Sequence, residues 1–481
     1  MQPRVGELHD SRVNISLRGA AEAIGLGLGV ATTVWVSRTV GPAYFGYYAV
    51  MLTIINIGAV FINAGLSTAG SQQIANHPRR AGEILGIVTA LRACVALVLI
   101  LGGLITLAVA PVDPVLRAYL LVGLIAWALL PLRSEWALVA QGRVRVLSLI
   151  RVTASAASLL AAIFLVRDVS DADLVPWISL APAFVAAAGS AFAANRASPV
   201  RRAVGSARLI ARAYLTDGLH YLKADASALI FTSSDRLFLY AFTTPAIVGL
   251  YEAAYRVIQP FYTISSVVGD AMYLQLAEAF GTDRLKATFR RYLDLMCFAT
   301  FPLGFFLLAF APTVIAVLYG TRYAGASDYL SILGWVITFG YTSGVTVIPF
   351  SAWNRPREYG NSQAIGGALN LALNAILIPP FRGTGAAWAT VAAKVSVTIA
   401  GLRYFRQVSD YPLLRDFAEY LIISAAAFVA GSIVGRLAPG PQIYGMVAFG
   451  LVYLALWAFV RGRRYRDPST RLPAASETGL G

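Results

Sequence analysis

Charged and polar side chains recur at helical spacing inside segments that are otherwise apolar. The longest row runs from Glu252 and Arg256 past Pro260 to Asp270 in steps of three and four residues. Residues with this spacing share one face of a helix. Ionisable groups inside apolar helices cost about 2.5–3.5 kcal/mol each on insertion scales, and they usually mark a pathway or a charged partner. Rows of this kind indicate a water-filled cavity between helices.

Basic residues on three such rows provide a binding chemistry for anions. Arginine offers planar, bidentate donors that match phosphate oxygens, and lysine offers a point charge. A cavity lined by several of these side chains would suit an anionic cargo. The predicted substrate-binding residues are Arg18, Lys223, Arg236 and Arg256.

Acidic and amide side chains accompany these cations. Glu22 follows Arg18 by one helical turn, and Arg256 follows Glu252 by one turn, so each pair can neutralise itself. One carboxylate could instead bind a coupling proton or Na⁺. The predicted cavity and ion-coupling residues are Glu22, Asp225, Asp235, Glu252, Asp270, Asn370, Asn374 and Lys394.

Simpler interpretations apply to several polar residues. Asn370 and Asn374 fit interhelical hydrogen bonding at least as well as a cavity. Arg92, Arg133 and Arg151 lie mostly near the ends of apolar segments, where long side chains can reach the membrane boundary.

Signatures of enzymes are absent from the sequence. No phosphate-binding loop of the G-x-x-x-x-G-K-[ST] type occurs, and neither does H-E-x-x-H, C-x-x-C or G-x-S-x-G. Both cysteines, Cys94 and Cys297, lie in apolar segments and are interpreted as packing residues. We therefore predict that the protein is not an enzyme, needs no metal or other cofactor, and uses H⁺ or Na⁺ at most as a coupling ion.

The composition identifies the elements that must position these residues. Of 481 residues, 58% are hydrophobic and only 13% charged, against about 25% charged in soluble domains. A membrane-spanning helix needs about 20 mostly apolar residues. Fourteen such segments are predicted: 15–37, 46–70, 83–110, 116–140, 146–166, 174–195, 217–242, 246–275, 292–318, 328–352, 361–379, 385–405, 417–437 and 442–460.

The distribution of basic residues predicts the orientation. With the N-terminus in the cytoplasm, 25 Lys and Arg residues fall on the inside and 6 on the outside. This agrees with the positive-inside rule and predicts that both termini are cytoplasmic. Topology and anionic lipid also account for the net charge of +15, so no nucleic-acid partner is expected.

A short stretch occurs twice, six predicted segments apart. "VGPAYFGYYAV" (40–50) returns as "TTPAIVGLYEAA" (243–254), with proline, alanine, glycine and tyrosine in register at an offset of 203. Because six is even, the copies run in the same direction, as in a parallel repeat.

The predicted fold is an all-α polytopic membrane protein with two parallel six-helix bundles around a central cavity, plus two C-terminal helices. The predicted divisions are an N-terminal bundle (1–195), a basic cytoplasmic linker (196–216), a C-terminal bundle (217–405), and two further helices with a tail (406–481).

Several longer stretches resemble a known family. "RTVGPAYFGYYAVMLTIINIGAVFINAGLSTAGSQQIA" (38–75) is similar to the helix 1–2 region of bacterial polysaccharide transport flippases of the Wzx type. "SSDRLFLYAFTTPAIVGLYEAAYRV" (233–257) resembles the Asp-Arg segment of that family. "LYGTRYAGASDYLSIL" (318–333) and "NRPREYGNSQAIGGALNLALNAILIPPFRGTGAAWATV" (354–391) resemble later parts. This family belongs to the multidrug/oligosaccharidyl-lipid/polysaccharide exporter (MOP) superfamily.

The resemblance implies a function in surface polysaccharide biosynthesis. Such a protein would move an undecaprenyl-diphosphate-linked oligosaccharide from the inner to the outer leaflet of a bacterial cytoplasmic membrane by alternating access. It would contact membrane lipid and could cooperate with polymerase or export proteins of O-antigen, lipopolysaccharide or exopolysaccharide pathways. The alternatives are a lipid II flippase and a multidrug/cation antiporter of the same superfamily. By family position, Arg18 and the Asp235-Arg236 pair match charged sites.

Overall fold

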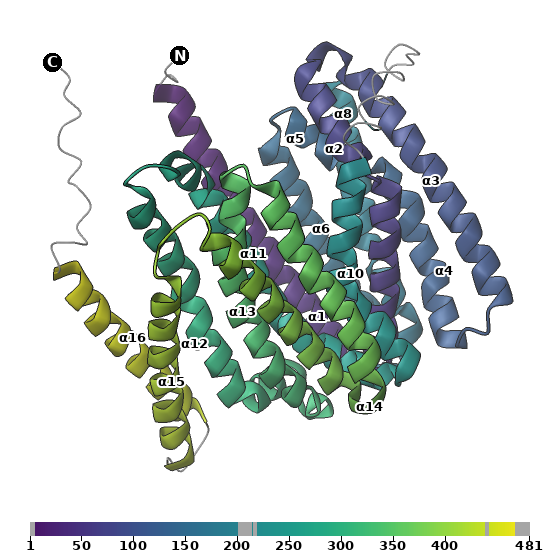
Figure 1. Ribbon diagram of the computed structural model, residues 1–481. Helices are drawn as coiled ribbons and strands as arrows, with labels where there is room; N and C mark the ends of the chain where they lie inside the picture. Colours follow the sequence, from purple (N-terminus) through teal and green to yellow (C-terminus); the bar gives the residue numbers. More distant parts are fainter. Residues whose placement is uncertain (1–4, 201–213, 215–218, 438–441, 467–481) are drawn as a thin grey trace, which may run out of the picture. The chain divides into compact units, whose positions relative to one another are not determined.

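A computed structural model describes residues 5–200, 214, 219–437 and 442–466, except for the side chains of 5–20, 219–221, 223–228, 230–232, 263, 264, 266 and 463–466. Within these ranges all regular structure is helical (Figure 1). Ten described helical stretches are long and apolar enough to cross a membrane. The prediction of an all-α polytopic membrane protein is therefore confirmed.

Two of the ten stretches each join two predicted segments across a break. The stretch Ala21–Asn63 is interrupted at Gly41, whose φ of 80° lies in the region that favours glycine. The stretch Pro356–Phe405 is interrupted at Arg382, which has a φ of 52°. The predicted segments 217–242 and 246–275 form helices that are not among the ten. The number fourteen stays a prediction.

The chain divides into two compact units, residues 1–252 and 253–481. In the first unit α1 packs against α4, α6 and α10, and α2 packs against α3 and α5. The helices of this unit are α1 (Val5–Asn63), α2 (Leu66–Asn76), α3 (Ala81–Val109), α4 (Pro114–Leu129), α5 (Glu135–Ala140), α6 (Val144–Leu165), α7 (Val175–Ile178), α8 (Leu180–Ala197) and α10 (Leu219–Phe242).

The boundary between the units falls within α11 (Pro245–Ala279). Helix α10 packs against α1 and belongs to the first unit. The predicted two-bundle division stays a prediction, and most of the predicted linker 196–216 lies outside the described residues.

The two copies of the repeated stretch contact each other. A Cβ atom added at Gly46 would lie 1.8 Å from the carbonyl oxygen of Pro245, and one added at Gly249 would lie 1.9 Å from the carbonyl oxygen of Pro42. Such reciprocal contacts are what a local two-fold axis between the copies produces. Glycine recurs at this position because any side chain would separate the two backbones.

The second unit is built around α12. Helices α13 and α15 pack against α12, while α14 packs against α13 and α16 against α15. Aromatic rings fill the contact between α12 and the C-terminal helices, including Phe301 beside Phe417 and Phe306 beside Phe449. The two C-terminal helices therefore share a core with α12. The helices of this unit after α11 are α12 (Leu285–Tyr319), α13 (Ala326–Ala352), α14 (Pro356–Phe405), α15 (Leu413–Leu437) and α16 (Ile443–Arg466).

Candidate functional site

The candidate site forms where a predicted membrane segment is broken. The apolar run 116–140 does not make one helix, because α4 ends in a short 3₁₀ turn, Leu130–Leu132, and α5 starts only at Glu135. Pro131 lies inside that turn, and Arg133 after it is extended, with ψ of 103°. Proline lacks an N–H group and interrupts the helical ladder, so backbone carbonyls at the break need other donors.

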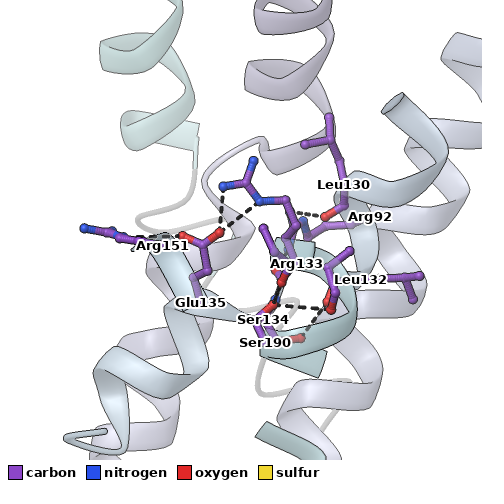
Figure 2. Close-up of polar contacts among 10 residues, drawn as sticks. Arg92, Leu130, Leu132, Arg133, Ser134, Glu135, Arg151 and Ser190 are labelled. Carbon is purple, nitrogen blue, oxygen red and sulfur yellow. Dashed lines mark hydrogen bonds and ion pairs between the residues drawn. The ribbon is translucent and has the colours of Figure 1, made fainter. Parts of the chain in front are cut away.

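Arg92 of α3 supplies those donors. Its Nη1 donates to the Arg133 carbonyl at 2.9 Å, and its Nη2 donates to the Leu130 carbonyl at 2.7 Å (Figure 2). The residue is 5% exposed. On the other side of the break, the Ser134 amide donates to the hydroxyl of Ser190 in α8 at 2.9 Å. The break is therefore held from two helices, and this geometry fixes where Arg133 and Glu135 lie.

An ion-pair network extends from the break to α1 and α6. Arg133 Nη2 lies 2.6 Å from Glu135 Oε1, and Arg151 Nε lies 3.9 Å from Glu135 Oε2 (Figure 2). Arg151 Nη1 also donates to Glu22 Oε1 at 2.9 Å. We call Glu22, Arg133, Glu135 and Arg151 the open network. With Arg92 beside it, the group holds three arginines and two glutamates, an excess of one positive charge.

The side chains of the open network are partly exposed. The exposed fractions are 39% for Arg133 and 43% for Arg151, with 19% for Glu135 and 28% for Glu22. Guanidinium groups that are both positioned and accessible can donate hydrogen bonds to the oxygens of a phosphate or carboxylate ligand. The open network is therefore suited to bind an anion.

A second ion-pair network, at the α10–α11 junction, is buried. Arg236 Nε donates to Glu252 Oε2 at 2.6 Å, and Arg236 Nη1 lies 3.4 Å from Asp235 Oδ1. The Tyr251 hydroxyl donates to Asp235 Oδ2 at 2.6 Å. The side chains of Asp235, Arg236 and Glu252 are only 5%, 10% and 4% exposed. We call Asp235, Arg236, Tyr251 and Glu252 the closed network.

The two glutamates of the predicted one-turn pairs each contact an arginine on another helix. Glu252 pairs with Arg236 of α10, and Glu22 pairs with Arg151 of α6. Spacing along one helix identifies neighbours on that helix and does not reveal these contacts between helices. The one-turn pairs stay predictions. Arg236 therefore joins α10 to α11 through its contact with Glu252. Its predicted role in substrate binding stays a prediction.

The other predicted site residues are spread over both units. Lys394 lies over the Tyr262 ring, 5.6 Å from its centroid, and the buried Asn374 donates to Asn370 at 3.1 Å. Arg256 is half-buried and Asp270 exposed. The side chains of Arg18, Lys223 and Asp225 lie outside the described residues. The predicted binding and coupling roles of these residues stay predictions.

Sequence reasoning missed most of the open network. Arg133 and Arg151 were assigned to the membrane boundary, and Glu135 was not selected. The available signal was Pro131 inside an apolar segment, followed within four residues by Arg133 and Glu135. Interrupted apolar segments point to binding sites in transporters, because broken helices expose backbone and side-chain polar groups there.

Comparison with known structures identifies the fold. The lipid II flippase MurJ in its inward closed conformation matches with a TM-score of 0.78 at 13% identity, over 94% of this chain and 100% of that chain. An outward-facing multidrug resistance MATE transporter of the MOP superfamily matches with a TM-score of 0.56 at 14% identity, over 82% and 96% of the two chains. The chain thus shares its fold with these two proteins.

Comparison with protein families gives the narrower assignment. Residues 35–328 match the family described as polysaccharide biosynthesis protein, and the chain belongs to that family. A probable low-salt glycan biosynthesis flippase from Haloferax volcanii is 25% identical over 166 residues, which are 34% of this chain and 35% of that protein. The match therefore spans about a third of that relative. The predicted resemblance to polysaccharide transport flippases is confirmed.

Proposed function

We propose that this protein is a flippase, not an enzyme, that moves an oligosaccharide linked to undecaprenyl diphosphate across the membrane for surface polysaccharide biosynthesis. It works by alternating access in a bacterial cytoplasmic membrane, with both termini in the cytoplasm. A proton or Na⁺ gradient drives it. The substrate then passes to polymerase or export proteins of an O-antigen, lipopolysaccharide or exopolysaccharide pathway.

The observation that carries the proposal is the open network in a chain of the polysaccharide biosynthesis family. Its two arginines are accessible and come from a helix break and from α6. The buried Arg92 beside the open network brings the group to an excess of one positive charge. A diphosphate carries negative oxygens that match the paired donors of guanidinium groups. A cationic drug would be repelled by the same excess charge, which disfavours the multidrug alternative.

The test is a lipid extraction from the host. The gene is deleted, polyprenyl-diphosphate-linked sugars are extracted, and their masses are compared with those from the parent strain. The proposal predicts accumulation of one complete lipid-linked repeat unit and loss of the matching surface polymer. Reintroducing the wild-type gene should reverse both changes.

Two variants connect this phenotype to the site. Arg133→Gln should fail to restore the polymer, whereas Arg143→Gln, which alters an exposed arginine just before α6, should restore it. Accumulation of a lipid-linked peptidoglycan precursor would instead indicate the lipid II alternative. No lipid accumulation, together with altered sensitivity to cationic compounds, would overturn the proposal in favour of the antiporter.

A further inference from the structure

The donors that would hold a diphosphate are already occupied in the open network. Arg133 directs both Nε and Nη2 at one oxygen of Glu135, at 3.0 and 2.6 Å. Arg151 directs Nη1 at Glu22 and lies near the second oxygen of Glu135. The paired N–H donors of guanidinium are those that phosphate oxygens use. Ligand and carboxylate therefore compete for the same atoms.

Partial exposure makes such an exchange feasible. Exposed ion pairs contribute roughly 0.2–1 kcal/mol each, since water and counterions stabilise the separated groups. Removing one partner of a buried pair costs several kcal/mol, because the remaining charge stays without solvent. The open network has the accessibility that exchange requires, and the closed network lacks it.

We infer that Glu22 and Glu135 act as internal competitors of the diphosphate. They occupy the arginines when no ligand is bound, are displaced by the incoming diphosphate, and return to these arginines as it leaves. This inference rests on the proposed function and adds how the same site releases its ligand. A cationic site without competing carboxylates would retain a diphosphate and slow each transport cycle.

The inference predicts the direction of an affinity change. Glu135→Gln and Glu22→Gln each remove a negative charge and a competing acceptor, so each should bind diphosphate about tenfold more tightly, equivalent to about 1.4 kcal/mol. If the carboxylates merely hold the arginines in place, both variants should bind more weakly. The sign of the change separates the two roles.

The experiment uses the full chain in lipid nanodiscs. Titrations with inorganic pyrophosphate and with undecaprenyl diphosphate give the dissociation constants, and a liposome assay gives the flipping rate. Tighter binding with a slower rate is expected for both variants. Adding Arg133→Gln to Glu135→Gln should remove the gain. Glu278→Gln, an equal charge change at an exposed position of α11, should leave affinity and rate unchanged.

The outcomes also separate this inference from the proposed function. A gain with both ligands supports recognition of the diphosphate itself, and a gain with the lipid alone supports a ligand that must be membrane-borne. Unchanged or weaker binding in both glutamine variants, with normal binding by the wild type, overturns the inference and leaves the flippase proposal standing. No diphosphate binding by the wild-type protein would contradict both.

Discussion

The closed and open networks use the same residue types in different surroundings. In the closed network Arg236 lies between Asp235 and Glu252, and every side chain of the three is at most 10% exposed. In the open network Arg133 and Arg151 also contact carboxylates, yet about two-fifths of each side chain is exposed. Burial makes the ion pairs of the closed network difficult to separate. Exposure leaves the arginines of the open network available to a ligand.

The structural elements around each network also differ. The closed network includes Tyr251, one of the residues shared by the repeated stretches, and lies close in sequence to Gly249 at the backbone crossing. The open network lies at a break in a membrane segment that Arg92 stabilises. We therefore expect mutations in the closed network to reduce stability, and mutations in the open network to reduce transport.

The largest effect is expected from Arg236→Met. The change removes the guanidinium that contacts both buried carboxylates, Asp235 and Glu252, and breaking a buried pair in this way costs about 3–5 kcal/mol. Thermal unfolding of the purified protein in detergent measures the loss. Arg143→Met, at an exposed position, serves as the control. An unchanged unfolding midpoint would show that the closed network is not structural.

A smaller loss is expected from Tyr251→Phe. The change removes the hydroxyl that donates to Asp235 at 2.6 Å, and a hydrogen bond to a charged group contributes about 1.5–3 kcal/mol. The same unfolding measurement applies, with Tyr444→Phe at an exposed tyrosine of α16 as the control. Equal midpoints for the two variants would contradict a role for this hydroxyl in the closed network.

Gly249→Ala tests the crossing beside the closed network. The new methyl would lie 1.9 Å from the Pro42 carbonyl oxygen, so the helices must separate, and overpacking of this kind typically costs about 1–3 kcal/mol. Gly27→Ala is the control, since apart from its chain neighbours and the backbone of its own helix no atom lies within 4 Å of a Cβ there. Gly46→Ala disturbs the same crossing, so we expect the double variant to lose less than the sum. Strict additivity would argue against a shared contact.

Helices and turns were largely predictable from this sequence. Long apolar runs predict membrane helices because a helix satisfies its own backbone hydrogen bonds within one segment in lipid. Gly41 and Pro42 predict the break in α1. The breaks at Gly65 and Pro131 were not predicted, since both lie inside continuous apolar runs. Hydropathy measures the affinity of a segment for lipid and is insensitive to a few non-helical residues.

The site was less predictable than the fold. Helical spacing predicts that Glu22 lies on a polar face of its helix. It does not predict the contact with Arg151, which is 129 residues away on α6. Periodicity shows which residues share a face, and it carries no information about which helix that face meets. Arg92 shows the same limit, because its partners are backbone carbonyls at a break that hydropathy alone does not reveal.

The smallest effect on stability, with a large effect on transport, is expected from Arg151→Gln. The side chain is 43% exposed, so losing its pairs with Glu22 and Glu135 should change the free energy of unfolding by less than about 1 kcal/mol. Export should nevertheless fail, because one of the accessible guanidinium groups is gone and Glu22 is left without that partner. Unfolding in detergent and restoration of the surface polymer in the deletion strain measure the two quantities separately. Arg151→Lys keeps the charge but not the planar pair of donors, so partial restoration is expected. Full export by Arg151→Gln, or a stability loss as large as that of Arg236→Met, would remove the distinction between the two networks.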